Sequence, residues 1–218
     1  MFPLGSVLLP GSVLPLHIFE SRYRQLIEDC LGSGTPEFGV VLIERGHEVG
    51  GGDFRAMLGT VARLVQVAKS PDGRYAVAAV GIRRIRVREW LDDNPYPLAE
   101  VEDWPDTVGT AEEGPQLSQH IATLSAKTRR LNAFAAELGD QAATDADDLD
   151  DDPVIASYQL CGRAPVGPSD LQRLLGANGP SERLTMLDAV TDDVLAMLQF
   201  RLLTLENDTD DGLNFDQT

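Results

Sequence analysis

The chain has 218 residues, a hydrophobic share of 43% and a net charge of −17, values that suit a globular protein with a sizeable core. The acidic excess lies in the second half, since residues 1–104 carry 11 basic and 14 acidic residues whereas residues 105–218 carry 7 and 21. Such a surface repels phosphate, which disfavours non-specific binding to nucleic acid or to an anionic membrane. The sequence has no signal-peptide pattern and no apolar run of membrane-spanning length, so we expect a cytoplasmic protein.

The first 32 residues predict two extended segments and a helix. Residues 7–9 are a short apolar run that ends at the turn dipeptide of Pro10 and Gly11. Residues 14–18 alternate apolar and polar side chains, which is typical of a half-buried strand. Ser21 has the side chain of a helix N-cap, and the apolar residues after it have helical spacing.

The rest of the first half predicts further strands. Residues 38–43 are an apolar run of strand length, and residues 44–53 form a glycine-rich loop. Two longer strands, about 55–69 and 74–88, are joined by Ser-Pro-Asp-Gly, whose residues suit the successive positions of a turn. Another strand follows Pro95. Several consecutive strands with one early helix predict a twisted or barrel-like antiparallel sheet.

After Trp104 the apolar spacing becomes that of helices. One helical face runs from Leu117 to Leu138, and Gly139 follows it as a C-cap. The next segment, 140–152, contains seven aspartates and no basic residue, which predicts a solvated loop.

Three further helices are predicted before the C-terminus. The first follows Pro153, Ser169 caps the second, and Ser181 caps a long third helix. Residues 206–218 are acidic and predicted to be disordered. We therefore predict an α+β protein with a β-domain at 1–104, a helical bundle at 105–205 that includes the acidic loop, and an acidic tail at 206–218.

The opening of the chain resembles that of the Lon protease N-terminal domain, the substrate-recognition part of these ATP-dependent proteases. The recurrent family pattern is FPL, then PG, then LPLHIFE and RY, which here are residues 2–4, 10–11, 14–20 and 22–23. The motif residues to which the resemblance gives a structural role are Pro10, Gly11, Pro15, His17, Phe19, Glu20, Arg22 and Tyr23. The resemblance extends to about residue 203. It implies a PUA-like antiparallel β pseudo-barrel with one early helix, followed by a C-terminal α-helical bundle.

The sequence offers no residues for the chemistry of a complete Lon protease. Such an enzyme needs a nucleotide-binding loop and a Ser–Lys peptidase dyad. The chain has two lysines, Lys69 and Lys127, and neither has the sequence context of either function. No triad order, paired-carboxylate signature or metal-ligand spacing stands out, and Cys30 and Cys161 are expected to be buried free thiols. We therefore predict no catalytic residue, metal or cofactor, and a stand-alone, non-enzymatic family member that lacks the ATPase and peptidase modules.

Some polar and aromatic residues are better explained by structure than by function. For His17 we favour a structural role over a catalytic one, namely a packed side chain that fixes the corner by hydrogen bonding. The alternating arginines Arg84, Arg86 and Arg88 are interpreted as a solvated strand face rather than an RNA-binding stripe. For Trp104, interior packing is expected.

Another set of residues provides candidate contacts for a partner. The family resemblance implies that the partners are proteins, a protease among them, or unfolded peptide segments. We expect the binding site in a cleft between the two halves, bordered by the loops at 44–54 and 91–97, because ligand sites often lie at domain junctions. The candidate residues are Glu44, His47, Phe54, Trp90 and Tyr96. Two alternatives stay open, namely a PUA-like RNA-binding module and a hydrolase whose site no motif marks.

Overall fold

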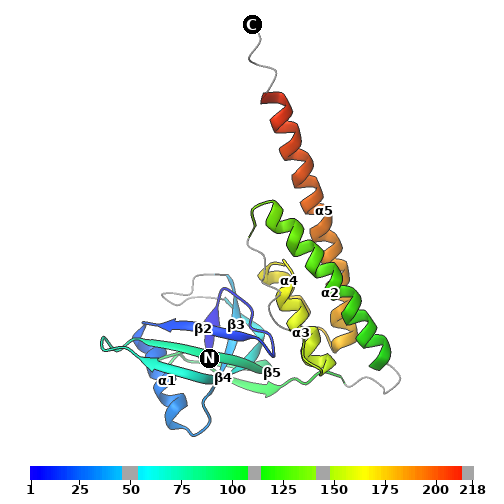
Figure 1. Cartoon of the computed structure of the whole chain (residues 1–218). Coiled ribbons are helices and arrows are strands. Elements are labelled where there is room, and N and C mark those ends of the chain that lie inside the picture. Colours follow the sequence, from blue (N-terminus) through cyan, green and yellow to red (C-terminus); the bar gives the residue numbers. More distant parts are fainter. Residues whose placement is uncertain (46–53, 108–113, 141–147, 213–218) are drawn as a thin grey trace.

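The computed structural model describes residues 1–45, 54–107, 114–140 and 148–212, with side chains up to residue 204 (Figure 1). Within these residues the chain forms six strands and five helices. They are β1 (Phe2–Leu4), β2 (Val13–Ile18), α1 (Ser21–Gly32), β3 (Glu37–Arg45), β4 (Phe54–Lys69), β5 (Tyr75–Leu91), β6 (Leu98–Asp103), α2 (Gly114–Glu137), α3 (Pro153–Arg163), α4 (Pro168–Leu175) and α5 (Pro180–Gly212). The strands precede all helices except α1, which confirms the predicted α+β class.

The strands form one mixed sheet in the order β1-β3-β4-β5-β2. The first half of β5 pairs with β2 and its second half with β6, both antiparallel. β1 runs parallel to β3, so the prediction of an antiparallel sheet is wrong for this strand. The sheet does not close, because no pairing joins β1 to β2 in the described part of the chain.

The predicted hairpin between the two long strands is confirmed. β4 and β5 pair antiparallel along most of their length, and residues 70–74 connect them. The Gly73 amide donates to the Ser70 carbonyl at 2.9 Å, and Asp72 Oδ1 accepts from the Arg74 amide at 3.2 Å. Gly73 has φ +82°, a conformation that a residue with Cβ seldom adopts.

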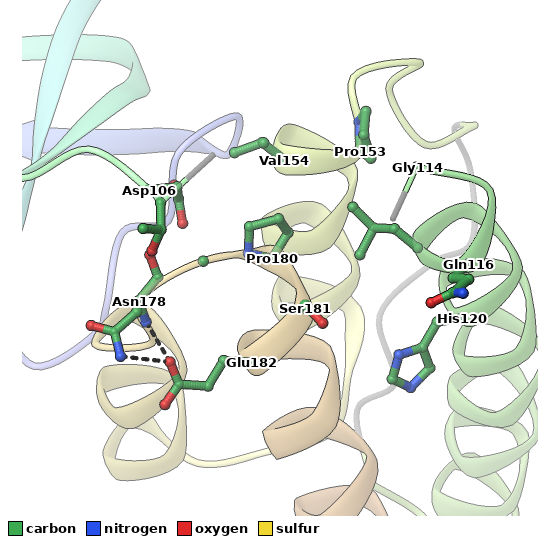
Figure 2. Close-up of a pocket in the computed structure, with 13 residues that line it drawn as sticks. Asp106, Gly114, Gln116, His120, Pro153, Val154, Asn178, Pro180, Ser181 and Glu182 are labelled. Atoms are coloured by element: carbon green, nitrogen blue, oxygen red, sulfur yellow. Dashed lines mark hydrogen bonds between the residues drawn. The ribbon is translucent and has the colours of Figure 1, made fainter. Parts of the chain in front are cut away.

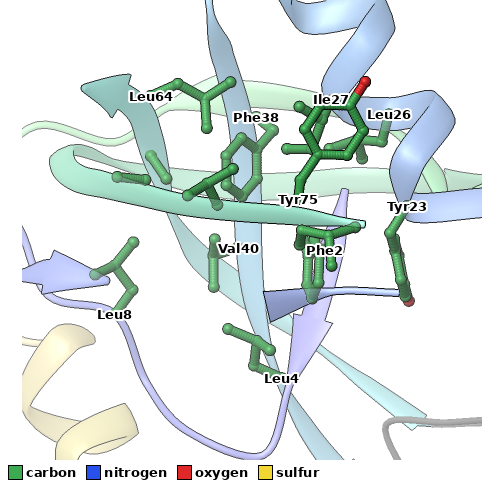
Figure 3. Packing of buried hydrophobic residues seen from close by; sticks show 14 residues of the cluster. Phe2, Leu4, Leu8, Tyr23, Leu26, Ile27, Phe38, Val40, Leu64 and Tyr75 are labelled. Carbon is green, nitrogen blue, oxygen red and sulfur yellow. The ribbon is translucent and has the colours of Figure 1, made fainter. Parts of the chain in front are cut away.

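A core of aromatic and branched side chains lies between α1 and the sheet (Figure 3). Tyr23, Leu26 and Ile27 of α1 are buried against it. The rings of Phe2 and Tyr23 stack with centroids 4.1 Å apart, so the first residues of the chain and α1 share one packing unit. The buried members are Phe2, Leu4, Leu8, Ile18, Tyr23, Leu26, Ile27, Phe38, Val40, Ala62, Leu64, Tyr75, Val77 and Ala79.

The apolar run at residues 7–9 is not a strand, and this prediction is wrong. Leu8 packs into the β-domain core, whereas Leu9 packs into the helical core. The Leu8 carbonyl accepts a hydrogen bond from Thr60 Oγ1 at 2.6 Å. The run is apolar because it lies between two cores, and the first strand of the sheet is instead formed by residues 2–4.

Helix boundaries differ from the predicted serine caps. Ser21 is the first helical residue of α1, and the N-cap position is occupied by Glu20, whose side chain makes no capping bond. α4 begins at Pro168 with Gly167 at its N-cap, and α5 begins at Pro180. Proline is favoured in the first helical turn, which explains why these two helices begin just ahead of the serines.

Two helix ends agree with their sequence signals. Gly139 has φ +85° beyond the end of α2, which confirms the predicted C-cap. The Asp152 side chain accepts from the Val154 amide and so caps α3. The segment 141–147 of the aspartate-rich loop lies outside the described residues, and α5 continues to Gly212, into the segment expected to be an acidic tail.

Pro10 and Gly11 form the corner that brings the N-terminal segment against α3. Pro10 is buried, and the Gly11 amide donates to the Gly81 carbonyl at 2.8 Å. Gly11 has φ +78°, and a Cβ atom there would lie 2.8 Å from Ile155 Cγ2 of α3. Pro15 lies on the edge strand β2, where a residue without an amide hydrogen is tolerated.

The other motif residues divide between packing and exposure. Arg22 Nε donates to Glu20 Oε2 at 3.0 Å, and the Arg22 guanidinium lies 4.5 Å from the centre of the Tyr23 ring. His17 is exposed on β2 opposite Ala76, so the expectation of a packed, hydrogen-bonded histidine is wrong. Phe19 is 58% exposed and does not join the core.

Three helices of the second half begin at the same end of the helical half (Figure 1). Lys127 of α2 pairs with Asp188 of α5, and Arg201, further along α5, pairs with Asp140 beyond the end of α2. These contacts show that α2 and α5 run in the same direction. The starts of α2, α3 and α5 consequently come together beside the linker that follows β6.

Candidate functional site

A buried polar network joins the two halves of the chain. It consists of Arg84 from β5, Asp106 from the linker after β6, Tyr158 from α3 and Arg183 from α5, and we call these four residues the junction network. Arg84 is only 3% exposed and Arg183 is 0% exposed. The strand β5 does alternate arginines with Ile85 and Val87, as predicted. The expectation that Arg84 is solvated is wrong, because the end of α4 covers this side chain.

Arg84 binds the C-terminal end of α4. Its Nη1 atom donates to the carbonyls of Leu175 at 2.6 Å and Ala177 at 2.5 Å, and its Nη2 atom lies 3.3 Å from Asp106 Oδ1. The end of a helix carries partial negative charge, which favours a cation there. Burial lowers the pKa of Arg84, and the nearby Tyr158 and Asp106 oppose this shift.

Arg183 completes the network from the other side. It donates to Asp106 Oδ1, to Ser157 Oγ at 2.6 Å and to the Leu174 carbonyl at 3.3 Å. Its guanidinium lies 3.4 Å from the centre of the Tyr158 ring, and the Tyr158 hydroxyl donates to Asp106 Oδ2 at 2.8 Å. A single carboxylate therefore holds two guanidinium groups and a phenol, and burial raises the pKa of Tyr158 above its usual range.

A pocket of about 600 Å³ lies next to this network, where the three helix starts meet (Figure 2). Asp106 belongs to both, because it lines the pocket and binds both arginines. The lining side chains and backbone come from the linker, from the starts of α2, α3 and α5, and from the turn before α5. The described lining residues are Asp106, Thr107, Gly114, Gln116, Leu117, His120, Pro153, Val154, Asn178, Gly179, Pro180, Ser181 and Glu182.

The pocket combines apolar walls with polar edges. Leu117, Val154 and the two prolines supply apolar surface. Glu182 Oε2 accepts from the backbone and the side-chain amide of Asn178, both at 2.8 Å (Figure 2). The first turns of helices also leave backbone amides without partners in the helix. Such a lining suits an apolar side chain whose flanking peptide groups need hydrogen-bond partners.

The described part of the chain offers neither a metal site nor a reactive thiol. No group of three histidine, cysteine, aspartate or glutamate side chains there is placed to hold a metal ion. Cys161 is fully buried, and burial raises the pKa of its thiol to about 12, so it is not a nucleophile at neutral pH. None of the described helices is both long and apolar enough to cross a membrane.

Of the residues predicted from the loops, those that the structure describes do not line this pocket. Glu44 is exposed at the end of β3, Phe54 is 69% exposed at the start of β4, and His47 lies outside the described residues. Trp90 is half-buried under the guanidinium of Arg55, which lies 5.0 Å from its ring. Glu44, His47, Phe54 and Trp90 stay predicted contacts for a partner.

The structure does bring parts of the two predicted loops together. Arg55 donates two hydrogen bonds of 3.0 Å to the carboxylate of Asp93, which connects the start of β4 to the loop after β5. Tyr96 packs against the β-domain core, and its hydroxyl donates to Asp29 Oδ2 at 2.7 Å. Burial and this hydrogen bond raise the pKa of Tyr96 to about 12, which indicates a packing role.

No local pattern in the sequence marks the residues of the junction network as a group. Arg183 had a usable signal, because it lies on the same helical face as the buried Leu187 and Val190. A charged residue on an apolar helix face indicates a buried partner. Asp106 and Asn178 had no comparable signal, since both lie in irregular segments.

Comparisons with known proteins agree on one family. The family model described as the ATP-dependent protease La (Lon) substrate-binding domain matches residues 1–189. Lon protease 1 of Herpetosiphon aurantiacus is 27% identical over 203 residues, covering 90% of this chain and 24% of the relative. Lon protease 2 of Sorangium cellulosum is 34% identical over 106 residues, covering 48% of this chain and 13% of the relative. The chain thus spans about a quarter or less of the length of these curated relatives.

Solved structures show the same fold. The crystal structure of a Lon N-terminal domain protein from Xanthomonas campestris has a TM-score of 0.59 and 29% identity, covering 86% of this chain and 95% of that one. The N-terminal domain of the Lon protease of the Mycobacterium avium complex has a TM-score of 0.56 and 21% identity, covering 88% and 97%. At this lower identity the likeness concerns the fold alone.

Proposed function

The chain belongs to the Lon substrate-binding domain family, and on that premise we propose that it binds segments of protein substrates and catalyses no reaction itself. The observation that carries this proposal is the pocket at the junction of the two halves. It has apolar walls and lies at three helix starts, so it suits an apolar side chain within an unfolded segment. A finer proposal is an adaptor role, in which the chain delivers substrates to a protease or withholds them from it.

Binding to an unfolded protein tests the pocket. We would measure the anisotropy of fluorescein-labelled β-casein against the chain and against Ser181→Trp, which fills the pocket from the first turn of α5. The control is Thr185→Trp, one turn further on an exposed position of the same helix. We expect Ser181→Trp to weaken binding at least tenfold and the control to change it less than twofold. Equal affinities of all three proteins would contradict the proposal.

The non-enzymatic and adaptor proposals need separate assays. We expect the purified chain neither to hydrolyse ATP nor to degrade casein. Either activity, if it co-purifies with the chain and is lost in a variant of it, would contradict a non-enzymatic role. For the adaptor role, the chain is added to a purified Lon protease with casein, and a changed degradation rate that Ser181→Trp abolishes is the expected result.

RNA binding is the less favoured alternative, because the arginines that would carry it are engaged. Arg84 is buried on α4 carbonyls, Arg86 lies 4.4 Å from the ring centre of Trp104, and Arg88 pairs with Glu102. We expect no salt-dependent binding of a single-stranded RNA probe. Binding that is lost in Arg86→Ala and Arg88→Ala variants would revive this alternative.

A further inference from the structure

Helix α5 carries a second apolar surface on the side that faces away from α2. Leu198 is 1% exposed and packs against Leu131 and Ala135 of α2. By contrast, Met197, Phe200 and Leu203 are 57%, 73% and 58% exposed. Single exposed apolar side chains are ordinary, but neighbouring ones on one face of a helix indicate an interaction surface.

The spacing of this surface is that of a helix-pairing seam. Positions 189, 193, 196, 200 and 203 alternate steps of four and three, and so lie along one side of the helix. They hold Ala189, Asp193, Ala196, Phe200 and Leu203, and Met197 borders them; we call these six residues the α5 stripe. Small alanines next to large side chains provide the holes and knobs that a second helix needs.

Nothing in the described residues covers the α5 stripe. The contacts of α2 with α5 use other residues of α5: Leu198 packs against α2, Arg201 donates to the carboxylate of Asp140 and to the Leu138 carbonyl, and Asp188 and Asp192 pair with Lys127. Beyond Arg201, α5 extends past the end of α2 (Figure 1). The match to the family model ends at residue 189, so the α5 stripe lies almost entirely beyond it.

The charges around the stripe define what it can bind. Its first turn carries the exposed Asp193, whereas the neighbouring Asp192 is paired with Lys127 of α2 at 2.7 Å, and the sequence that follows the stripe, 206–211, has four acidic residues and no basic one. Arg201, the one basic residue of α5 after Arg183, is paired with Asp140. An apolar seam with acidic residues at both ends is complementary to an apolar surface bordered by lysine or arginine.

We propose that the α5 stripe binds an amphipathic helix of a protein partner whose apolar face is bordered by basic residues. This goes beyond substrate recognition at the pocket, since it uses a different surface and a different kind of ligand. The seam covers 15 residues, or about 22 Å of helix at 1.5 Å per residue, so the ligand has about four turns. A second copy is less suitable, because it would present the same acidic ends and so repel the first.

The test uses three fluorescein-labelled 18-residue helical peptides and anisotropy titrations with the full chain. The first peptide has leucines at the seam positions and lysines beside them, the second has glutamates in place of the lysines, and the third has glutamines in place of the leucines. We expect the first peptide to bind at least tenfold more tightly than either of the others. We expect Phe200→Gln to weaken its binding at least tenfold, because large buried aromatic side chains dominate such interfaces.

Matched variants separate this surface from others. Val65→Gln removes another exposed apolar side chain, 60% exposed against 73% for Phe200, from strand β4, and we expect less than a twofold effect. Asp193→Asn should make binding less sensitive to salt, since one fewer ionic contact is screened. Equal effects of Val65→Gln and Phe200→Gln, or equal binding of the lysine and glutamate peptides, would overturn the proposal.

Two further outcomes would assign the stripe to another occupant. If sedimentation reveals a dimer of the chain that Phe200→Gln dissociates, a second copy covers the stripe. Co-sedimentation with phosphatidylglycerol vesicles that depends on Phe200 would assign it to a membrane surface. Either result overturns the proposal, and neither bears on casein binding at the pocket.

Discussion

Removing the carboxylate of Asp106 tests the claim that the junction network holds the two halves together. Asp106→Asn keeps the shape of the side chain but leaves Arg84 and Arg183 without a negative partner. Both guanidiniums are buried, at 3% and 0% exposure, and cannot turn to solvent without opening the junction. The substitution therefore leaves two positive charges in a low-dielectric environment, where charges are costly.

The size of the effect follows from the burial of the three groups. Removing one partner of a buried ion pair costs about 3–5 kcal/mol. The Asp106 side chain is 14% exposed, so water already reaches part of it and the lower end of that range applies. With a urea m-value of about 2 kcal/mol/M, a loss of about 3 kcal/mol in the free energy of unfolding lowers the unfolding midpoint by about 1.5 M.

The assay is urea unfolding followed by far-ultraviolet circular dichroism and by tryptophan fluorescence. In a Trp90→Phe background, Trp104 reports on the junction, because the Arg84 guanidinium lies 4.6 Å from its ring centre. The control is Asp93→Asn, which removes an ion pair with Arg55 near the surface and should cost no more than about 1 kcal/mol. If Asp106→Asn and Asp93→Asn shift the midpoint equally, the junction network does not carry the stability assigned to it.

Three further predictions concern the corner, an ion pair and a thiol. Gly11→Ala should destabilise the fold by about 1–2 kcal/mol more than Gly34→Ala in urea unfolding, because both have φ near +78° but only the Gly11 Cβ would meet Ile155, at 2.8 Å. Hydrogen bonds from Arg83, and to a smaller extent from Arg63, lower the pKa of Glu37. The ionised Glu37 carboxylate therefore stabilises the fold above its unfolded pKa of about 4.3, and this contribution is lost as the pH falls through the lower pKa of the folded state. Glu37→Gln should accordingly cost about 1 kcal/mol at pH 7 and nothing near pH 2, and an equal cost at both values would contradict this origin. Cys161 should react with a thiol reagent only as fast as the protein unfolds, because the side chain is 0% exposed and its pKa is raised to about 12.

Local signals predicted most of the β-domain. The turn at residues 70–74 was recognisable because proline, aspartate and glycine each suit their position, and the alternation in residues 14–18 placed β2 correctly. The run at 7–9 was misassigned because an apolar run reports burial and not conformation. Leu8 and Leu9 are buried in different cores, and nothing local to the sequence distinguishes this from a strand.

The candidate site was much harder to predict, because it is made by tertiary contacts. The alternating pattern of β5 predicts correctly which face of the strand Arg84 lies on. It does not show that the end of α4 covers Arg84 there, so the side chain is buried and not solvated. The carbonyls that bind it, at Leu175 and Ala177, lie about 90 residues further along the chain. Backbone carbonyls leave no trace in a sequence, so such a contact is visible only once the halves are docked.

The two proposed binding surfaces differ in what they require of the fold, and this difference separates them experimentally. The pocket draws on the linker and on three helices, so it exists only while the junction network holds Asp106 in place. The α5 stripe lies on one helix, and its seam depends only on helical spacing and on α2 behind it. Asp106→Asn should therefore weaken binding of casein at the pocket while the basic peptide keeps its affinity for the stripe. An equal loss of affinity for both ligands would show instead that α5 itself becomes disordered when the junction opens. The helical half would then need the β-domain to hold α5 in place.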